Sequence, residues 1–167
     1  MIGNDIVDLD LARKESNWRR KGFLEKIFSQ QEQNLILNAS NPELMVWNLW
    51  SRKEAAYKIY NRSTGIKGYF PWLLQCCYDD ENTGKVIIDD FVFHTNTQIT
   101  DAYIYTIAVS EKVFFAKIKP LETAENIKKS NGIPYILDDF TNAVQPVSKT
   151  HHGRFQKIIS LYKLFNS

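Results

Sequence analysis

The sequence predicts an α+β fold in which an antiparallel sheet packs against one long central helix. Residues 42–60 (PELMVWNLWSRKEAAYKIY) read as one uninterrupted helix of about five turns. After residue 69 the pattern changes to short segments rich in Val, Ile, Phe, Tyr and Thr, which is typical of strands. A chain of 167 residues can bury one proper core. We therefore expect a single domain over residues 1–167, with a variable middle region at about 69–145.

Composition and charge narrow the class of protein. Hydrophobic residues make up 44% of the chain and charged residues 24%, as in an ordinary globular protein, and the net charge of +2 gives no strong field toward nucleic acid. No apolar run approaches a membrane span, and Asp5 and Asp8 do not suit a signal peptide. The adjacent Cys76 and Cys77 form neither a metal motif nor a structural disulfide. We expect a cytoplasmic protein without nucleic-acid or membrane partners.

The first nine residues, MIGNDIVDL, predict a short strand. Ile2, Ile6 and Val7 are β-formers, and Gly3–Asn4 would allow a local kink or bulge. Asp5 is then an acid embedded among β-formers. It is either a turn aspartate or a functional carboxylate.

Residues 11–38 predict helix in two pieces that break near Gly22. The first piece, residues 11–21, carries five cations and a single acid. These cations either form a solvated helix face or bind an acidic partner surface or phosphates. Its cations are Arg13, Lys14, Arg19, Arg20 and Lys21. In the second piece, Ser29 and Glu32 have the spacing of a capping box that starts a new helix.

The central helix carries the most informative side chains. Asn41 can cap its first turn, and Pro42 fits the first helical position. At roughly 100° per residue, Glu54 points almost the same way as Trp47, so a carboxylate lies in the middle of an aromatic face with Lys58 one turn further on. Such a carboxylate is costly unless it is paired or bound to a cation. The alternative is an ordinary Glu54–Lys58 pair on a solvated face.

The remainder predicts an antiparallel meander followed by a less regular segment. We expect strands at residues 72–78, 85–93, 101–109 and 112–118. Residues 121–129 suggest a short helix, and residues 131–145 are the least defined part. The final stretch predicts a turn at His152–Gly153, then a strand and a short closing helix.

Residues 148–154 (SKTHHGR) form a third polar cluster. Hydroxyl groups, imidazoles, a glycine and cations together suit an anion site, since all of them donate hydrogen bonds to phosphate. Zinc is disfavoured because the two histidines are adjacent and no third ligand lies near. The alternative is a polar turn between strands.

Together these clusters resemble the 4′-phosphopantetheinyl transferase superfamily. GNDIVDL at residues 3–9, WSRKEAAYK at 50–58 and SKTHHGR at 148–154 are similar to the family's G-x-D strand, its W/F-x-x-K-E-x-x-x-K helix and its S-x-S/T-H segment. The order of the segments is similar to the short holo-acyl-carrier-protein synthase type. The resemblance covers roughly residues 1–65 and 146–160, and the middle matches only in being mostly strand.

The resemblance implies roles for individual residues. Asp5 and Glu54 match the magnesium ligands, and Lys53 and Lys58 match the lysines that hold the pyrophosphate or assist proton transfer. His151 matches a histidine that contacts coenzyme A. The remaining predicted coenzyme A contacts are Ser148, Thr150, Arg154 and Arg13.

Two positions depart from the family pattern. The third acid of the two-lobed members is Val7 here, which leaves Asp8 as a secondary candidate. The arginine that the short type often has six residues after the aspartate is Leu11, so Arg13 is displaced by two positions.

The implied reaction is attack by a carrier-protein serine on the β-phosphate of coenzyme A, with Mg²⁺, releasing adenosine 3′,5′-bisphosphate. The partner is an acyl or peptidyl carrier protein of fatty-acid, polyketide or peptide type. A homo-oligomer is expected, a trimer as in the short type, unless the extra residues cover the cleft in a monomer. Two other interpretations stay open: another Mg²⁺-dependent phosphoryl or nucleotidyl transferase, and a non-catalytic module that binds acidic proteins.

Overall fold

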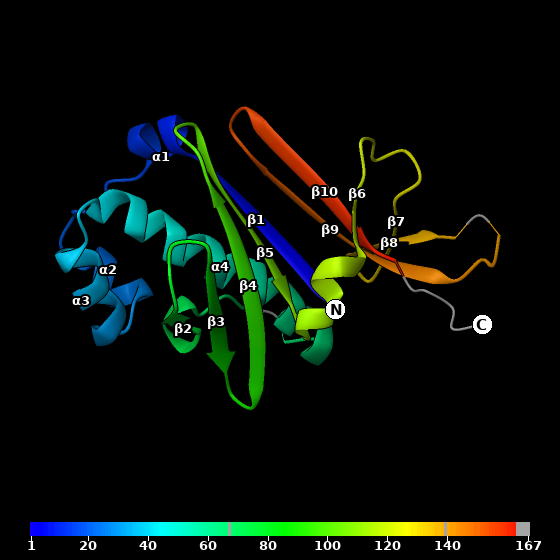
Figure 1. Cartoon of the computed structure of the whole chain (residues 1–167), viewed down its shortest axis with the longest axis horizontal. Helices are drawn as coiled ribbons and strands as arrows, with labels where there is room; N and C mark the ends of the chain where they lie inside the picture. Colours follow the sequence, from blue (N-terminus) through cyan, green and yellow to red (C-terminus); the bar gives the residue numbers. More distant parts are fainter. Residues whose placement is uncertain (67, 139, 163–167) are drawn as a thin grey trace.

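A computed structural model describes residues 1–66, 68–138 and 140–162. It confirms the α+β class: two five-stranded antiparallel sheets accompany one long helix, α4 (Pro42–Thr64) (Figure 1). The strand order is β1-β5-β4-β3-β2 in the first sheet and β6-β10-β9-β8-β7 in the second. Within these residues no helix is both long and apolar enough to cross a membrane.

The first sheet packs on α4 through one face. Its strands are β1 (Ile2–Asp8), β2 (Gln75–Tyr78), β3 (Thr83–Ile88), β4 (Phe91–Ile99) and β5 (Tyr103–Val109). The predicted alternation in β5 is confirmed, because Ile104, Thr106 and Ala108 are fully buried and the intervening residues are mostly half-buried. The predicted single strand at 85–93 is wrong, since a turn with positive φ at Asp89 divides it into β3 and β4.

The kink or bulge that Gly3–Asn4 would allow does not form. The pairing of β1 with β5 runs without interruption from Ile2 opposite Val109 to Asp8 opposite Tyr103. Gly3 is needed for a different reason: a Cβ there would overlap the carbonyl oxygen of Ala55 on α4. The glycine lets the central helix lie directly on the first strand.

The second sheet is built from the C-terminal half of the chain. Its strands are β6 (Ile118–Pro120), β7 (Lys128–Ser130), β8 (Ile133–Leu137), β9 (Val144–His152) and β10 (Phe155–Leu161). The predicted turn before the last strand is confirmed. The predicted closing helix lies outside the described residues.

Two predicted elements in this half are wrong. Residues 112–117 form a 3₁₀ helix in place of a strand, because Phe114 and Phe115 both pack toward the cluster around Val109 and Ile159. Residues 121–129 form no helix. They lead into β7, which turns back at Asn131–Gly132, where both residues have positive φ.

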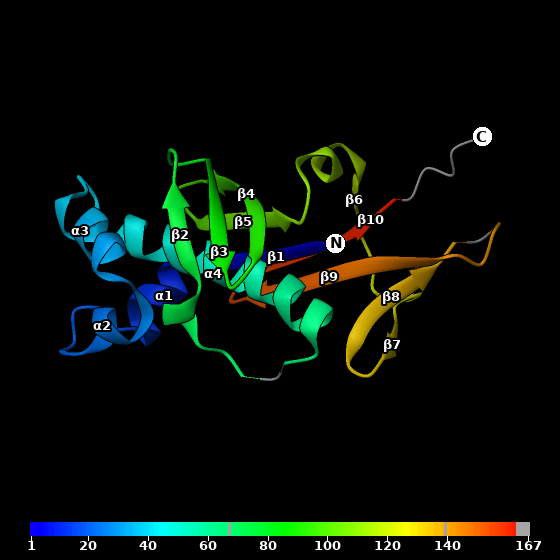
Figure 2. The same cartoon turned by 90° about the horizontal axis from the view of Figure 1, so that it is seen from below.

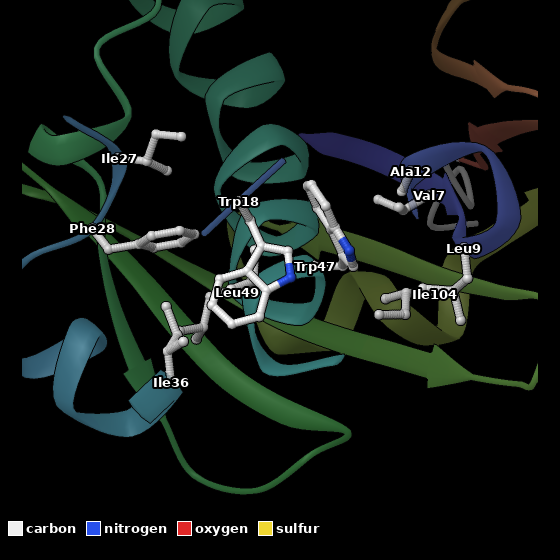
Figure 3. Close-up of a cluster of buried hydrophobic side chains, with 11 residues drawn as sticks. Val7, Leu9, Ala12, Trp18, Ile27, Phe28, Ile36, Trp47, Leu49 and Ile104 are labelled. Carbon is white, nitrogen blue, oxygen red and sulfur yellow. The ribbon is translucent and has the colours of Figure 1, made fainter. Parts of the chain in front are cut away.

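Three short helices flank the N-terminal half of α4: α1 (Leu9–Glu15), α2 (Phe23–Ile27) and α3 (Gln30–Asn38). The capping box at Ser29 and Glu32 and the Asn41 cap are confirmed. The first predicted piece ends earlier than expected, at Glu15, and the chain then buries Trp18 in the core. Figure 3 shows this buried cluster, which the N-terminal helices share with Trp47 and Leu49 of α4.

Candidate active site

The outer edge of β1 is covered by side chains of β9 rather than by a paired strand. Three backbone N–H groups at alternate positions of β1 donate hydrogen bonds to three side chains at alternate positions of β9. The bonds join Asn4 N to Ser148 Oγ (3.0 Å), Ile6 N to Thr150 Oγ1 (3.2 Å) and Asp8 N to His152 Nδ1 (2.9 Å). Alternate strand residues share one face, so the S-x-T-x-H spacing matches the N–H spacing of β1.

This contact corrects the predicted role of the two hydroxyl groups. Ser148 is fully buried and Thr150 is 6% exposed, and both are used to satisfy β1. They lie at the joint between the two sheets, where they position β1. The Thr150 hydroxyl donates its own hydrogen to Asp5 Oδ1, and burial keeps the Ser148 hydroxyl away from a phosphate in solution.

The carbonyl groups on the same edge are held by α4. Lys58 Nζ donates to Asn4 O (2.5 Å), and the Arg62 guanidinium donates to Ile2 O (3.1 Å). These two cations are four residues apart, so they lie on one helix face. Strand β1 is thereby fixed between α4 and β9 on the side where Asp5 projects.

Asp5 and Glu54 line the same cavity. Its volume is about 270 Å³, and its walls come from β1, α1, α4 and the end of β9. Asp5 Oδ1 accepts from Thr150 Oγ1 (3.2 Å) and lies 3.7 Å from Lys58 Nζ. Asp5 Oδ2 is buried and has no hydrogen-bond partner in the described part of the chain. The structure therefore brings together two acids that are 49 positions apart in the sequence.

Both carboxyl groups have a raised pKa. Burial and the negative charge of Asp5 together raise the pKa of Glu54 to about 7, against the opposing effect of Lys58. Burial likewise raises the pKa of Asp5. Two partly desolvated carboxylates that repel each other favour either a bound proton or a bound cation.

The donor set fits Mg²⁺. This ion prefers oxygen ligands and is usually held by one or two carboxylates, with substrate phosphates and waters completing the octahedron. In the described ranges no group of three or more His, Cys, Asp or Glu side chains could hold a metal on its own. An ion between Asp5 and Glu54 would use the unpartnered Asp5 oxygen and leave positions for a phosphorylated substrate.

The two motif lysines have different positions. Lys58 is partly exposed, and its ammonium lies 3.7 Å from Asp5 Oδ1; its role at the pyrophosphate stays a prediction. Lys53 is fully buried, and its ammonium donates to Ile27 O (2.9 Å), Glu32 Oε2 (2.7 Å) and Pro71 O (2.9 Å). The predicted pyrophosphate contact of Lys53 is corrected: its charge is paired within the core and does not reach the site.

Asp8 and Arg154 bind each other. The Arg154 guanidinium donates to both Asp8 oxygens (2.9 and 2.7 Å) and lies 2.9 Å from Asp10. This holds the pKa of Asp8 far below its usual value. Asp8 also caps α1, so it is not available as a metal ligand. The phosphate contact of Arg154 stays a prediction, and in the structure two carboxylates engage its guanidinium.

His151 and Arg13 lie at the edges of the site. His151 is exposed and lines the cavity of the two acids, which keeps it in reach of a substrate. Arg13 is exposed on α1 and pairs with Asp10 and Glu43, each at 3.2 Å. Arg13 belongs to the basic cluster of residues 13–21, which is exposed beside the cavity wall formed by Ala12 and Ser16.

Three further residues adjoin the site without having been predicted from the sequence. Tyr69 lies beside Glu54, and its pKa is raised by burial and by the charges of Glu54 and Asp5. His152 accepts from the β1 backbone, although His151 was the histidine singled out. Arg62 lies on the same helix face as Lys58 and donates to Ile2 O. In the sequence, only its spacing of four residues from Lys58 indicates that it lies on this face.

We expect Glu54 to destabilise the metal-free protein at high pH. Its pKa is raised from 4.5 to about 7 on folding, so the folded state holds the proton more tightly than the unfolded state. Between those values, stability is lost as pH rises, and Glu54→Gln removes this loss. In urea unfolding without divalent ions, the stability of Glu54→Gln relative to wild type should increase from pH 5 to pH 8. A difference that stays constant with pH would contradict the raised pKa.

Comparison with known proteins identifies the family. The family model of the 4′-phosphopantetheinyl transferase superfamily matches residues 1–108. A holo-[acyl-carrier-protein] synthase from Caldanaerobacter subterraneus is 32% identical over 71 residues, which cover 42% of this chain and 53% of that relative. The synthase from Chlamydia trachomatis is 30% identical over 87 residues, which cover 52% of this chain and 71% of that relative.

Solved structures show the same fold. ACPS from Chronobacterium ammoniagenes superposes with a TM-score of 0.52 at 13% identity, covering 65% of this chain and 93% of that chain. The holo-(acyl-carrier-protein) synthase from Bacillus anthracis, solved with CoA (3′,5′-ADP), has a TM-score of 0.50 at 19% identity, covering 64% of this chain and 91% of that chain. Together with the family match over residues 1–108, these observations show that the chain belongs to the 4′-phosphopantetheinyl transferase superfamily.

Proposed function

We propose that this protein transfers the 4′-phosphopantetheine group of coenzyme A to a serine of an acyl or peptidyl carrier protein, with Mg²⁺, and releases adenosine 3′,5′-bisphosphate. The observation that carries the proposal is the meeting of Asp5 and Glu54 in one cavity beside Lys58. The named relatives and the CoA-bound structural neighbour support it.

The side chains of the site have complementary tasks. Asp5 and Glu54 would hold Mg²⁺, which when bound neutralises charge on the pyrophosphate as the phosphorus–oxygen bond breaks. Lys58, 3.7 Å from Asp5, would place a further positive charge beside the pyrophosphate, where charge builds up on the leaving group. Thr150 orients the Asp5 carboxylate through its hydroxyl hydrogen bond.

We further propose that the basic cluster of residues 13–21 binds the carrier protein. Its cations are exposed, and Arg19 lies over the ring of Trp18 at 4.1 Å, which keeps its guanidinium at the surface. Carrier proteins that are acidic around their serine would be attracted to this surface. Its position next to the carboxylate cavity would bring the serine hydroxyl to the phosphate.

Compartment and assembly complete the proposal. Cys76 and Cys77 are both free thiols, which supports a reducing, cytoplasmic setting. A homotrimer with shared sites and a monomer whose extra residues cover the cleft remain the two expected assemblies. The molar mass measured by light scattering separates them.

Intact-mass analysis tests the transfer directly. An apo carrier protein is incubated with the enzyme, coenzyme A and Mg²⁺, and we expect its mass to increase by one phosphopantetheine group. Omission of Mg²⁺ and replacement of coenzyme A by a nucleoside triphosphate are the controls, and neither should give the product. Absence of any mass gain across fatty-acid, polyketide and peptide carriers would overturn the proposal.

A further inference from the structure

The ring of Tyr69 lies over the face of α4 that carries Glu54. Trp50, Glu54 and Tyr57 follow one another at spacings of four and three residues, so their side chains share one face of the helix. The Tyr69 ring meets the ring of Trp50 edge-on, with centroids 5.7 Å apart, and the ring of Tyr57 with centroids 4.9 Å apart. Because it contacts the helix residues on both sides of Glu54, the ring spans the position of that carboxylate.

The backbone before Tyr69 holds the ring in this place. Residues 68–74 pass back along α4 toward β2 (Figure 2). Gly68 has a φ of 137°, which other residues rarely adopt, and its N–H donates a hydrogen bond to Tyr57 Oη (3.3 Å). Tyr69 is therefore fixed on α4 by its neighbouring backbone as well as by its ring contacts.

The Tyr69 hydroxyl is buried near the two acids of the site. Burial and the negative charges of Glu54 and Asp5 raise its pKa, so the hydroxyl stays protonated and can donate a hydrogen bond. Its Oη nevertheless has no hydrogen-bond partner in the described part of the chain. A buried donor without a partner is costly, so its retention at this position calls for a further role.

The two acids of the site are not equally held. Asp5 Oδ1 accepts a hydrogen bond from Thr150 Oγ1 (3.2 Å) and lies 3.7 Å from Lys58 Nζ. Glu54 has a longer side chain and forms no ion pair within the ranges that the structure describes. Carboxylates that bind metals are generally oriented by a hydrogen bond from an outer partner. The Tyr69 hydroxyl can supply this bond to Glu54.

We propose that Tyr69 is a positioning residue of the metal site, whose hydroxyl donates a hydrogen bond to one oxygen of the Glu54 carboxylate and directs the other oxygen toward the cation. The inference rests on the proposed function, because it needs a cation between Asp5 and Glu54. It adds a residue that lies outside the three segments on which the family resemblance depends.

Manganese binding tests this role without turnover. Mn²⁺ is titrated into the protein with coenzyme A but without a carrier protein, and the free ion is measured by electron paramagnetic resonance. We expect Tyr69→Phe, which keeps the ring and loses only the hydroxyl, to weaken Mn²⁺ binding by about 10–100-fold. Tyr60→Phe is the matched control and should bind Mn²⁺ as wild type does. It removes a hydroxyl that donates to another carboxylate, Asp89 (2.7 Å), and neither residue lines the cavity of the two acids.

Urea unfolding without divalent ions separates positioning from packing. Because Tyr69 Oη has no partner in the described part of the metal-free protein, its removal should not lower the free energy of unfolding. A fall in this free energy together with unchanged Mn²⁺ affinity would show that the tyrosine only packs, and would overturn the inference.

Glu54→Gln separates this inference from the proposed function. Wild-type Mn²⁺ affinity in Tyr69→Phe, with weakened binding in Glu54→Gln, would overturn the role of Tyr69 and leave the metal site in place. Wild-type affinity in Glu54→Gln, or no Mn²⁺ binding to the wild-type protein, would overturn the metal site and the role of Tyr69 together.

Discussion

Replacement of Glu54 by glutamine is expected to reduce carrier modification by a factor on the order of 10³. Glutamine keeps the size of the side chain but removes the negative charge that would face the cation. Asp5 alone would then hold the metal, and charge on the breaking pyrophosphate would lose several kcal/mol of stabilisation, about tenfold in rate for each 1.4 kcal/mol. The initial rate of carrier mass gain at saturating coenzyme A measures the effect.

The matched control is Glu81→Gln, which makes the same change on an exposed loop away from the cavity. It should retain the wild-type rate. A folded Glu54→Gln protein with more than about a tenth of wild-type activity would contradict the magnesium role, since loss of a charged group at the reacting centre costs more than tenfold. Glu54 would then be a cavity carboxylate without a role in the transfer.

Lys53→Met is expected to lower the free energy of unfolding by about 3–5 kcal/mol. The substitution removes the ion-pair partner of Glu32 inside the core, where both residues are at most 1% exposed, and three hydrogen bonds of the ammonium. A domain of this size has about 5–15 kcal/mol of stability, so a large share would be lost. Urea unfolding followed by tryptophan fluorescence measures the change.

Lys58→Met on the same helix provides the contrast. Lys58 is partly exposed, so its removal should cost much less stability, while transfer activity should fall strongly. The folded fraction of Lys53→Met should keep its turnover. The reverse pattern, with Lys53→Met stable but inactive, would restore the pyrophosphate role that the sequence predicts for it.

The central helix and the direction of its Glu54 side chain could be predicted because both depend on residues close together in the sequence. Asn41 and Pro42 fix the start of α4, and the rotation of about 100° per residue places Glu54 on the face of Trp47. The same rotation turns the adjacent Lys53 away from that face and into the core. The ion-pair partner of the buried Lys53 is Glu32, which lies on another helix, and only the structure shows this contact.

The polar segment of β9 shows where sequence reasoning stops. Ser148 and Thr150 have the chemistry of an anion site, and nothing in their own segment shows that β1 takes up their hydroxyl groups. The same holds for Arg154, whose partner Asp8 is 146 positions away. Residue type predicted which groups could donate or accept, and the topology decided which partner each one meets.

The shared cation can be tested directly in crystals grown with coenzyme A and Mn²⁺, which prefers the same oxygen ligands as Mg²⁺ and gives an anomalous signal. We expect one anomalous peak bonded to carboxylate oxygens of both Asp5 and Glu54, with pyrophosphate oxygens among the other ligands. A cation held by only one of these carboxylates, or a cation at another place on the chain, would contradict the proposed site.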